Sequence, residues 1–215
     1  MIFWSNDFLE MITVSRREFI ASFVGVGLLH PTTRLFSQLV PPKSGRIDVH
    51  HHFGSPAWIS MVDSKRTQGY QTWQSYAPSR AIEDMDRGGV ATALISITTP
   101  GIWFGNVDET RRLARQENEY GAKLVSDHKG RFGLFAVLPL PDVDATLREI
   151  EYAFDTLKAE GVGLLSNWGN KWLGDDSFTP VLDELNRRNA VVYTHGAAPA
   201  CCGGNFIPNV PETTI

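Results

Sequence analysis

Cysteine is scarce in this chain. Its 215 residues include only two, Cys201 and Cys202, and these are adjacent. Neighbouring cysteines rarely pair, because the small ring that their disulfide would close is strained. The chain is therefore not a disulfide scaffold, and with 42% hydrophobic residues it can be stabilised by an ordinary hydrophobic core. We interpret the two thiols as reduced structural or loop residues, with a metal or redox role as the alternative.

Clustered positive charge is also missing. The formal net charge is −4, and the 20 lysines and arginines are spread along the chain without a basic stripe. Proteins that bind nucleic acid need clustered basic residues to neutralise the phosphates. We therefore expect no nucleic-acid partner.

The apolar run near the N-terminus is too short to cross a membrane. It covers residues 19–29 and is interrupted by a serine and two glycines, whereas a spanning helix needs about 20 apolar residues. We therefore expect no stable membrane insertion. The run follows Arg16 and Arg17 in an order that resembles a twin-arginine export signal. This predicts a signal segment over residues 1–40 and a periplasmic or extracellular protein; the alternative is an ordinary amphipathic helix on a cytoplasmic chain.

Beyond a linker predicted at residues 41–45, apolar and amphipathic segments alternate through a domain expected over residues 46–215. Short apolar, β-branched runs predict strands; they cover residues 47–53, 90–97, 132–138, 161–166 and 190–195. Amphipathic segments between them predict helices; they cover residues 79–88, 107–128, 142–160 and 178–188. Such an alternation indicates a parallel sheet covered by helices.

Capping residues support these boundaries. Ser79 is expected to cap the first of the four helices, and Gly88 with Gly89 to end it. Asp142 or Asp144 is expected to cap the third.

A phosphate-binding glycine motif is absent after the first strand, where a dinucleotide-binding sheet would carry G-x-G-x-x-G. The first strand ends in histidines instead, and functional residues at the carboxyl ends of strands are typical of barrels. We predict an α/β fold that is a partial TIM-type (β/α)8 barrel with about five βα units. Because a whole barrel has eight strands and about 250 residues, we expect this chain to hold the N-terminal part of a barrel that is truncated on its C-terminal side.

Three consecutive histidines end the first strand. Side chains alternate along a strand, so His50 and His52 face one way and His51 the other. Two imidazoles at the mouth of a barrel can bind one divalent metal ion. Asp48 is expected on the face of His50 and His52, one layer deeper, where it could orient a ligand or close a hydrogen-bond network.

His195 ends the fifth predicted strand and faces the same mouth. Three converging imidazoles are the ligand set of an open catalytic site rather than of a closed structural one. The alternative for each histidine is a hydrogen-bonded structural role.

Several segments together resemble the amidohydrolase superfamily, and within it the amidohydrolase-related branch that contains aminocarboxymuconate-semialdehyde and 6-methylsalicylate decarboxylases. They are the His-x-His end of the first strand, Arg131 to Pro141, Gly161 to Asn167, and Tyr193 to His195. The resemblance covers about residues 46–211.

The resemblance implies one divalent metal ion, zinc in particular, held by His50, His52 and His195. It further implies an aspartate from strand eight as a ligand and a histidine from strand six for proton transfer, both expected beyond Ile215, so that no catalytic acid is identified in this chain. Asn167 and Trp168 stand where binuclear hydrolases carry a carboxylated lysine, which fits the mononuclear branch.

The activity that the resemblance implies is non-oxidative decarboxylation of an aromatic or unsaturated carboxylic acid. As partners we expect this small-molecule acid and a second copy of the chain in a homodimer. Phe53, Asn167 and Trp168 are candidate residues of the substrate pocket, and Trp58 is either a further wall or a core residue. Two alternatives stay open: a metal-dependent hydrolase of a lactone or cyclic amide, and an exported fragment without activity.

Overall fold

The computed structural model describes residues 45–67 and 70–197. The predicted signal segment, most of the predicted linker and the two cysteines lie outside these residues. In the described part of the chain, no helix combines the length and the apolar character needed to cross a membrane.

Five parallel strands form the central sheet, in the order β1-β2-β3-β4-β7. Their bounds are Arg46–His52 (β1), Val90–Ser96 (β2), Phe132–Val137 (β3), Gly161–Leu165 (β4) and Val191–His195 (β7). Each predicted strand is present to within two residues at either end. The strands follow one another in chain order, as in a barrel, so the prediction of a partial (β/α)8 barrel is confirmed.

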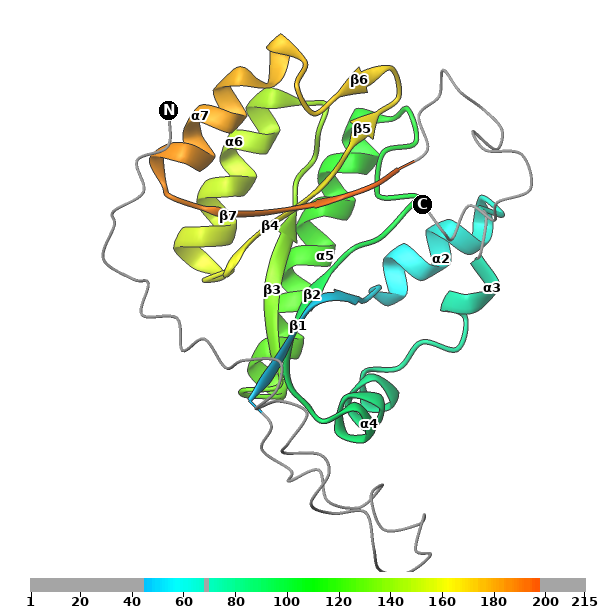
Figure 1. Cartoon of the computed structure of the whole chain (residues 1–215). Helices are drawn as coiled ribbons and strands as arrows, with labels where there is room; N and C mark the ends of the chain where they lie inside the picture. Colours follow the sequence, from blue (N-terminus) through cyan, green and yellow to red (C-terminus); the bar gives the residue numbers. More distant parts are fainter. Residues whose placement is uncertain (1–44, 68–69, 198–215) are drawn as a thin grey trace, which may run out of the picture. The chain divides into compact units, whose positions relative to one another are not determined.

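Helices connect the strands and, as Figure 1 shows, α5, α6 and α7 lie along one face of the curved sheet. The helices are Pro56–Ser64 (α2), Tyr70–Trp73 (α3), Pro78–Gly88 (α4), Val107–Asp127 (α5), Val143–Glu151 (α6) and Thr179–Arg187 (α7). A short antiparallel hairpin of Asn167–Trp168 (β5) and Lys171–Trp172 (β6) follows β4.

The capping predictions are met in part. The left-handed backbone of Gly89, with φ at 65°, ends α4, and the Asp142 side chain accepts a hydrogen bond from the Ala145 N–H at the start of α6. Ser79 does not cap α4, because the helix already begins at Pro78, whose fixed φ suits the first helical position.

The end of one helix differs from the prediction, and one helix was missed. The α6 helix ends at Glu151 and continues as a π-helix over Tyr152–Thr156, short of the predicted end at residue 160. The α2 helix was not predicted at all, although Ser55 accepts a hydrogen bond from the Trp58 N–H and thereby caps it. A serine directly before a proline is a start signal that the sequence already carries.

The main core lies between the sheet and its helices. Ala93 and Ile95 of β2, Leu134 of β3 and Leu164 of β4 are fully buried against apolar residues of α4, α5, α6 and α7. Since alternate side chains of a strand face opposite ways, Leu94 and Ser96 of β2 and their counterparts face the inside of the half-barrel. This inner face carries the candidate site.

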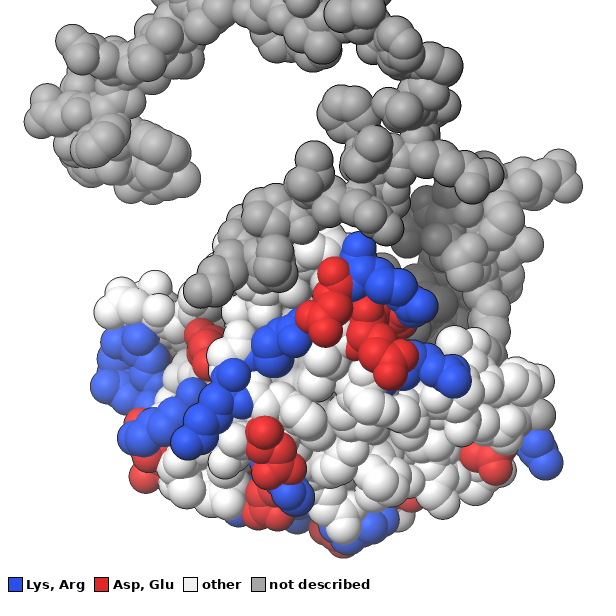
Figure 2. Space-filling view, turned by 90° about the horizontal axis from the view of Figure 1, so that it is seen from below, with Lys and Arg blue, Asp and Glu red and all other residues white. Residues whose placement is uncertain are grey.

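Charged side chains of both signs mix on the surface that Figure 2 displays. Several pair within or next to α4, such as Arg87 with Asp84, and Arg131 with Asp86 at 2.7 Å. Exposed pairs of this kind contribute little to stability, typically below about 1 kcal/mol.

Candidate metal centre

Two histidines of β1 direct their rings to one point. The Nε2 atoms of His50 and His52 lie 3.0 Å apart, and their ring centroids are 4.7 Å apart with the rings nearly perpendicular. Two nitrogens bound at about 2.0–2.1 Å to one tetrahedral ion are roughly 3.3 Å apart. The pair is therefore spaced much as two ligands of a single ion are.

His195 reaches the same point from the far side of the sheet. β1 and β7 are the two ends of the strand order, yet the His195 ring centroid lies 5.2 Å from that of His50 and 5.0 Å from that of His52. One ligand nitrogen from each ring lies within 4.8 Å of the other two. Only a strongly curved sheet brings its end strands this close. The structure thus brings together the three histidines that the sequence singled out.

The surroundings of His52 favour its neutral imidazole, the form that binds a metal ion. Burial, followed by the charges of His195 and His50, lowers the pKa of His52 to about 4. Nδ1 of His195 lies 2.7 Å from the carbonyl oxygen of Gly196. A carbonyl oxygen only accepts, so this Nδ1–H donates and Nε2 is left for an ion. The chemistry of the three donors fits a divalent ion.

Asp48 and His51 form a separate pair. The Asp48 carboxylate lies 3.1 Å from Nδ1 of His51 and accepts a hydrogen bond of 3.0 Å from the backbone N–H of His50. Its hydrogen-bond partners are thus the His51 ring and the His50 backbone, whereas the sequence placed it on the face of the His50 and His52 rings. The pairing of β1 with β2 is irregular between Asp48 and His51, and this irregularity breaks the simple alternation of side chains.

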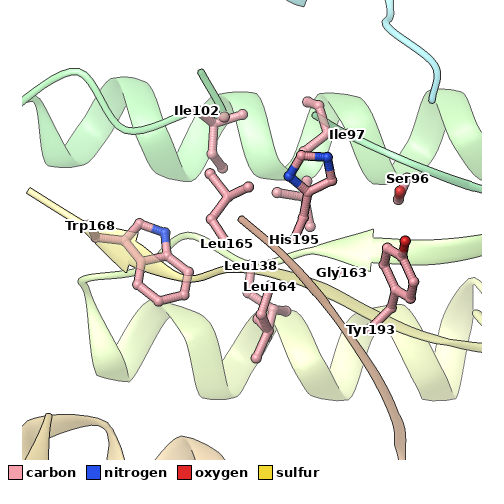
Figure 3. A pocket seen from close by; sticks show the side chains of 12 residues that line it. Ser96, Ile97, Ile102, Leu138, Gly163, Leu164, Leu165, Trp168, Tyr193 and His195 are labelled. Atoms are coloured by element: carbon pink, nitrogen blue, oxygen red, sulfur yellow. The ribbon is translucent and has the colours of Figure 1, made fainter. Parts of the chain in front are cut away.

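A narrow cavity adjoins the histidine cluster. Its wall is built from the carboxyl ends of β2, β3, β4 and β7, and it includes Ser96, Gly163, Trp168, Tyr193 and His195 (Figure 3). Trp168 thus takes a place in the wall, as the sequence suggested. Neither Ser96 nor Tyr193 was predicted as a site residue. The signal at Ser96 was its position at the end of a strand, and Tyr193 was noted only as the start of a family-like segment.

Phe53, which was proposed as a pocket wall, lies in the core, and so does Trp58, for which the core was the open alternative. Phe53 is 1% exposed and stacks at 6.4 Å on Tyr120 of α5. Trp58 is fully buried and donates its indole N–H to the Gly101 carbonyl oxygen at 2.7 Å. Both follow β1, where α2 turns the chain outward, so neither lines the described cavity. Asn167 is buried in the hairpin and its side-chain oxygen accepts from the Ser166 hydroxyl at 3.0 Å.

A buried carboxylate anchors the turn that follows the histidines. Glu117 of α5 is inaccessible to solvent, and it accepts hydrogen bonds from the backbone N–H of Ser55, at 2.9 Å, and from the Ser55 hydroxyl. Burial raises the pKa of Glu117 to about 7, against the opposing effect of these hydrogen bonds. Together with the bond from the Phe53 N–H to the Ser96 carbonyl, at 3.2 Å, this contact holds the end of β1 in place.

Comparison with characterised proteins finds relatives that are named as decarboxylases and that match most of this chain. The chain is 41% identical over 183 residues to decarboxylase yanB of Aspergillus niger, covering 79% of this chain and 49% of that protein. It is 39% identical over 163 residues to 6-methylsalicylic acid decarboxylase of Penicillium expansum, covering 72% of this chain and 49% of that protein. The chain therefore spans about half the length of the curated relatives that it matches.

Solved structures share the fold. The crystal structure of an amidohydrolase II superposes with a TM-score of 0.69 at 24% identity, over 77% of this chain and 53% of that one. A dihydroxybenzoic acid decarboxylase from Polaromonas, solved with manganese and the inhibitor 2-nitroresorcinol, superposes with a TM-score of 0.61 at 21% identity, over 72% of this chain and 50% of that one. The profile of the amidohydrolase family matches residues 47–213. Both this match and the identity to the curated relatives show that the chain belongs to the amidohydrolase family.

Proposed function

We propose that this protein is a metal-dependent, non-oxidative decarboxylase of aromatic carboxylic acids. The observation that carries the proposal is the convergence of His50, His52 and His195 on one point at the carboxyl ends of the strands. Functional groups of (β/α)8 barrels gather at that end. The relatives named above are decarboxylases by name, and one acts on 6-methylsalicylic acid.

The three imidazoles would hold one divalent ion, for which we propose zinc. Zinc is commonly bound by three histidines at open sites, while the manganese in the Polaromonas structure makes manganese the competing choice. When bound, such an ion would hold the substrate carboxylate and offset negative charge that builds up as CO2 leaves. The pKa of His52, lowered to about 4 by burial, keeps this ligand free of a competing proton.

The residues of this chain would bind and orient the acid. The bond between the ring and the carboxyl carbon breaks, CO2 leaves, and the ring carbon takes up a proton. The apolar wall around Trp168 excludes water from one side of the site. We assign the proton donor and a fourth ligand to residues outside the described part of the chain, in which the three histidines form the one cluster of metal-binding side chains.

A direct test measures metal content and CO2 release together. The full chain is purified, its metal is quantified by mass spectrometry, and CO2 is followed with 6-methylsalicylate and 2,6-dihydroxybenzoate. We expect about one ion per chain, lost in His52→Ala and kept in the control His128→Ala, since His128 packs edge-on against Phe132. Metal content unaffected by the loss of His52 would contradict the site. Lactone hydrolysis without CO2 release would favour the hydrolase alternative.

We further propose that the protein is exported through the twin-arginine pathway. The support is the order of Arg16, Arg17 and the apolar run that follows them. Fusing residues 1–45 to a reporter that is active only after export tests this directly. Replacing both arginines by lysine is expected to abolish export, and export that persists in this variant would contradict the proposal.

A further inference from the structure

The cavity beside the histidine cluster contains a hydroxyl group that has no partner among the described residues. The Ser96 side chain is 2% exposed, and among the described residues its Oγ has no hydrogen-bond partner. The great majority of buried polar side-chain atoms in proteins are hydrogen-bonded. A buried hydroxyl left without a partner is costly, so its position calls for an explanation.

Ser96 lies on the inner face of the sheet at the level of the histidines. It pairs in register with His52 across β1 and β2, and its carbonyl oxygen accepts from the Phe53 N–H and lies 3.4 Å from Nδ1 of His52. The backbone of Ser96 is therefore engaged with the metal centre, while its side chain points into the cavity (Figure 3). Tyr193 directs its hydroxyl toward the Ser96 end of the same cavity (Figure 3).

A glycine leaves space beside the Ser96 side chain. Gly163 of β4 lines the cavity, and a Cβ atom added there would meet the Cβ of Ser96 at 3.4 Å and that of Phe135 at 3.9 Å. These are ordinary to slightly tight contacts, so an alanine would fit the fold but fill the gap. The free volume of the whole cavity is about 10 Å³, which is close to the smallest volume that holds one water molecule.

We propose that Ser96 and Gly163 form a niche for a single oxygen atom carried by the substrate ring, and that the niche selects hydroxylated over unsubstituted aromatic acids. This inference rests on the proposed function. Beyond Ser96, the side chains of the wall are aliphatic except for Trp168, Tyr193 and His195. A substituent without hydrogen-bonding capacity would leave the Ser96 hydroxyl unsatisfied, whereas a ring hydroxyl would form a hydrogen bond with it. His195, which also lines the cavity, is not needed as a partner for that hydroxyl and remains a metal ligand.

The test compares two ligands that differ by one hydroxyl group. Dissociation constants of salicylate and benzoate are measured by calorimetry on the full chain loaded with zinc. In Ser96→Ala we expect salicylate to bind about five- to tenfold more weakly and benzoate to change less than about twofold, since one neutral hydrogen bond is lost. Gly163→Ala keeps the hydroxyl but fills the gap, and it should produce the same selective loss.

Thr146 provides a matched control. Its hydroxyl is also buried without a partner among the described residues, but it lies on α6 and does not line the cavity. Thr146→Val should leave both dissociation constants unchanged. Equal weakening of salicylate and benzoate in Ser96→Ala, or no weakening of either, would overturn the proposal.

A second measurement separates this inference from the proposed function. If the wild-type chain binds neither acid, the proposed substrate class is wrong, and the niche is then decided by a high-resolution crystal structure of the ligand-free chain. An ordered water bonded to Ser96 Oγ, absent in Ser96→Ala, supports a niche for one oxygen. A dry cavity with the hydroxyl turned toward a protein acceptor overturns it.

Discussion

The strands β1 and β3 belong to one sheet but are built in opposite ways. All six residues of β3 are buried, whereas β1 exposes Ile47 at 60% and Val49 at 50% and ends in histidines. Packing on both faces stabilises β3. The end of β1 is held by hydrogen bonds, from the Phe53 N–H to Ser96 and from Ser55 to Glu117. The two strands therefore have different roles: β3 stabilises the core, and β1 carries the histidines of the candidate site while contributing little to the core.

The largest effect is expected on metal binding, from a substitution on β1 that should leave folding almost unchanged. His52→Ala should lower metal affinity by orders of magnitude, since one of three clustered donors is lost. Because the side chain contributes little to the core, the midpoint of unfolding of the metal-free chain should change little. Metal affinity is measured by competition with a chelator, and unfolding by denaturant titration. A large loss of metal-free stability would show that β1 supports the fold after all.

On β3 the reverse result is expected. Leu134 is 1% exposed and packs against α5 at Gly121. Leu134→Ala should lower the free energy of unfolding by about 2–5 kcal/mol, as large-to-small core substitutions do. The folded fraction should still bind metal with unchanged affinity. Denaturant titration in the presence and absence of metal measures both quantities, and a cost below about 1 kcal/mol would show a loosely packed core.

The anchor of β1 should respond to pH. Burial raises the pKa of Glu117 to about 7 from the ordinary 4.5, so between these values the folded chain keeps a proton that the unfolded chain has released. Stability from this group is therefore full below pH 4.5 and falls as the pH rises to 7. At about 1.4 kcal/mol per pKa unit, the total loss is about 3 kcal/mol.

Glu117→Gln tests this dependence, because an amide keeps one acceptor for Ser55 but does not titrate. The free energy of unfolding of the variant should vary less between pH 4.5 and 7 than that of the wild type. Glu119→Gln, on the same helix but with an exposed side chain, serves as the control and should preserve the wild-type slope. Equal slopes in all three proteins would show that Glu117 is ionised throughout.

The smallest effect is expected at the exposed residues of β1. Ile47→Thr should change the free energy of unfolding by less than about 0.5 kcal/mol, because the side chain is largely in solvent. The same substitution should reduce self-association, since exposed apolar side chains on a strand at the end of the sheet promote contact between copies. Sedimentation velocity measures this, and unchanged association would direct the search for a homodimer contact elsewhere.

Much of the fold was predictable because the signals are local. Apolar runs and the glycine after Gly88 located the strands and the end of α4 without knowledge of their partners. The start of α4 at Pro78 and the π-helix after Glu151 were not predicted, since capping and helix type depend on competing hydrogen bonds within a single turn.

In the candidate site, too, some residues could be predicted from the sequence and others could not. Alternation along β1 was enough to pair His50 with His52, and the position of His195 at a strand end suggested a third ligand. The hydrophobicity of Phe53 gave no means of distinguishing a pocket wall from a core residue. That distinction depends on the direction in which α2 leads the chain and on the space left at Gly121 of α5.

From the sequence alone one could derive the order of the five sheet strands and of four helices between them, and the shared face of His50 and His52. Two adjacent cysteines also gave no basis for a disulfide framework. The tertiary structure was needed to show that His195 meets them, and that the buried Ser96 hydroxyl beside them has no partner in the described part of the chain. The physical reason is the curvature of the sheet. Periodicity specifies which side of a strand a residue faces, but the distance between β1 and β7 follows from the twist and packing of all five strands together.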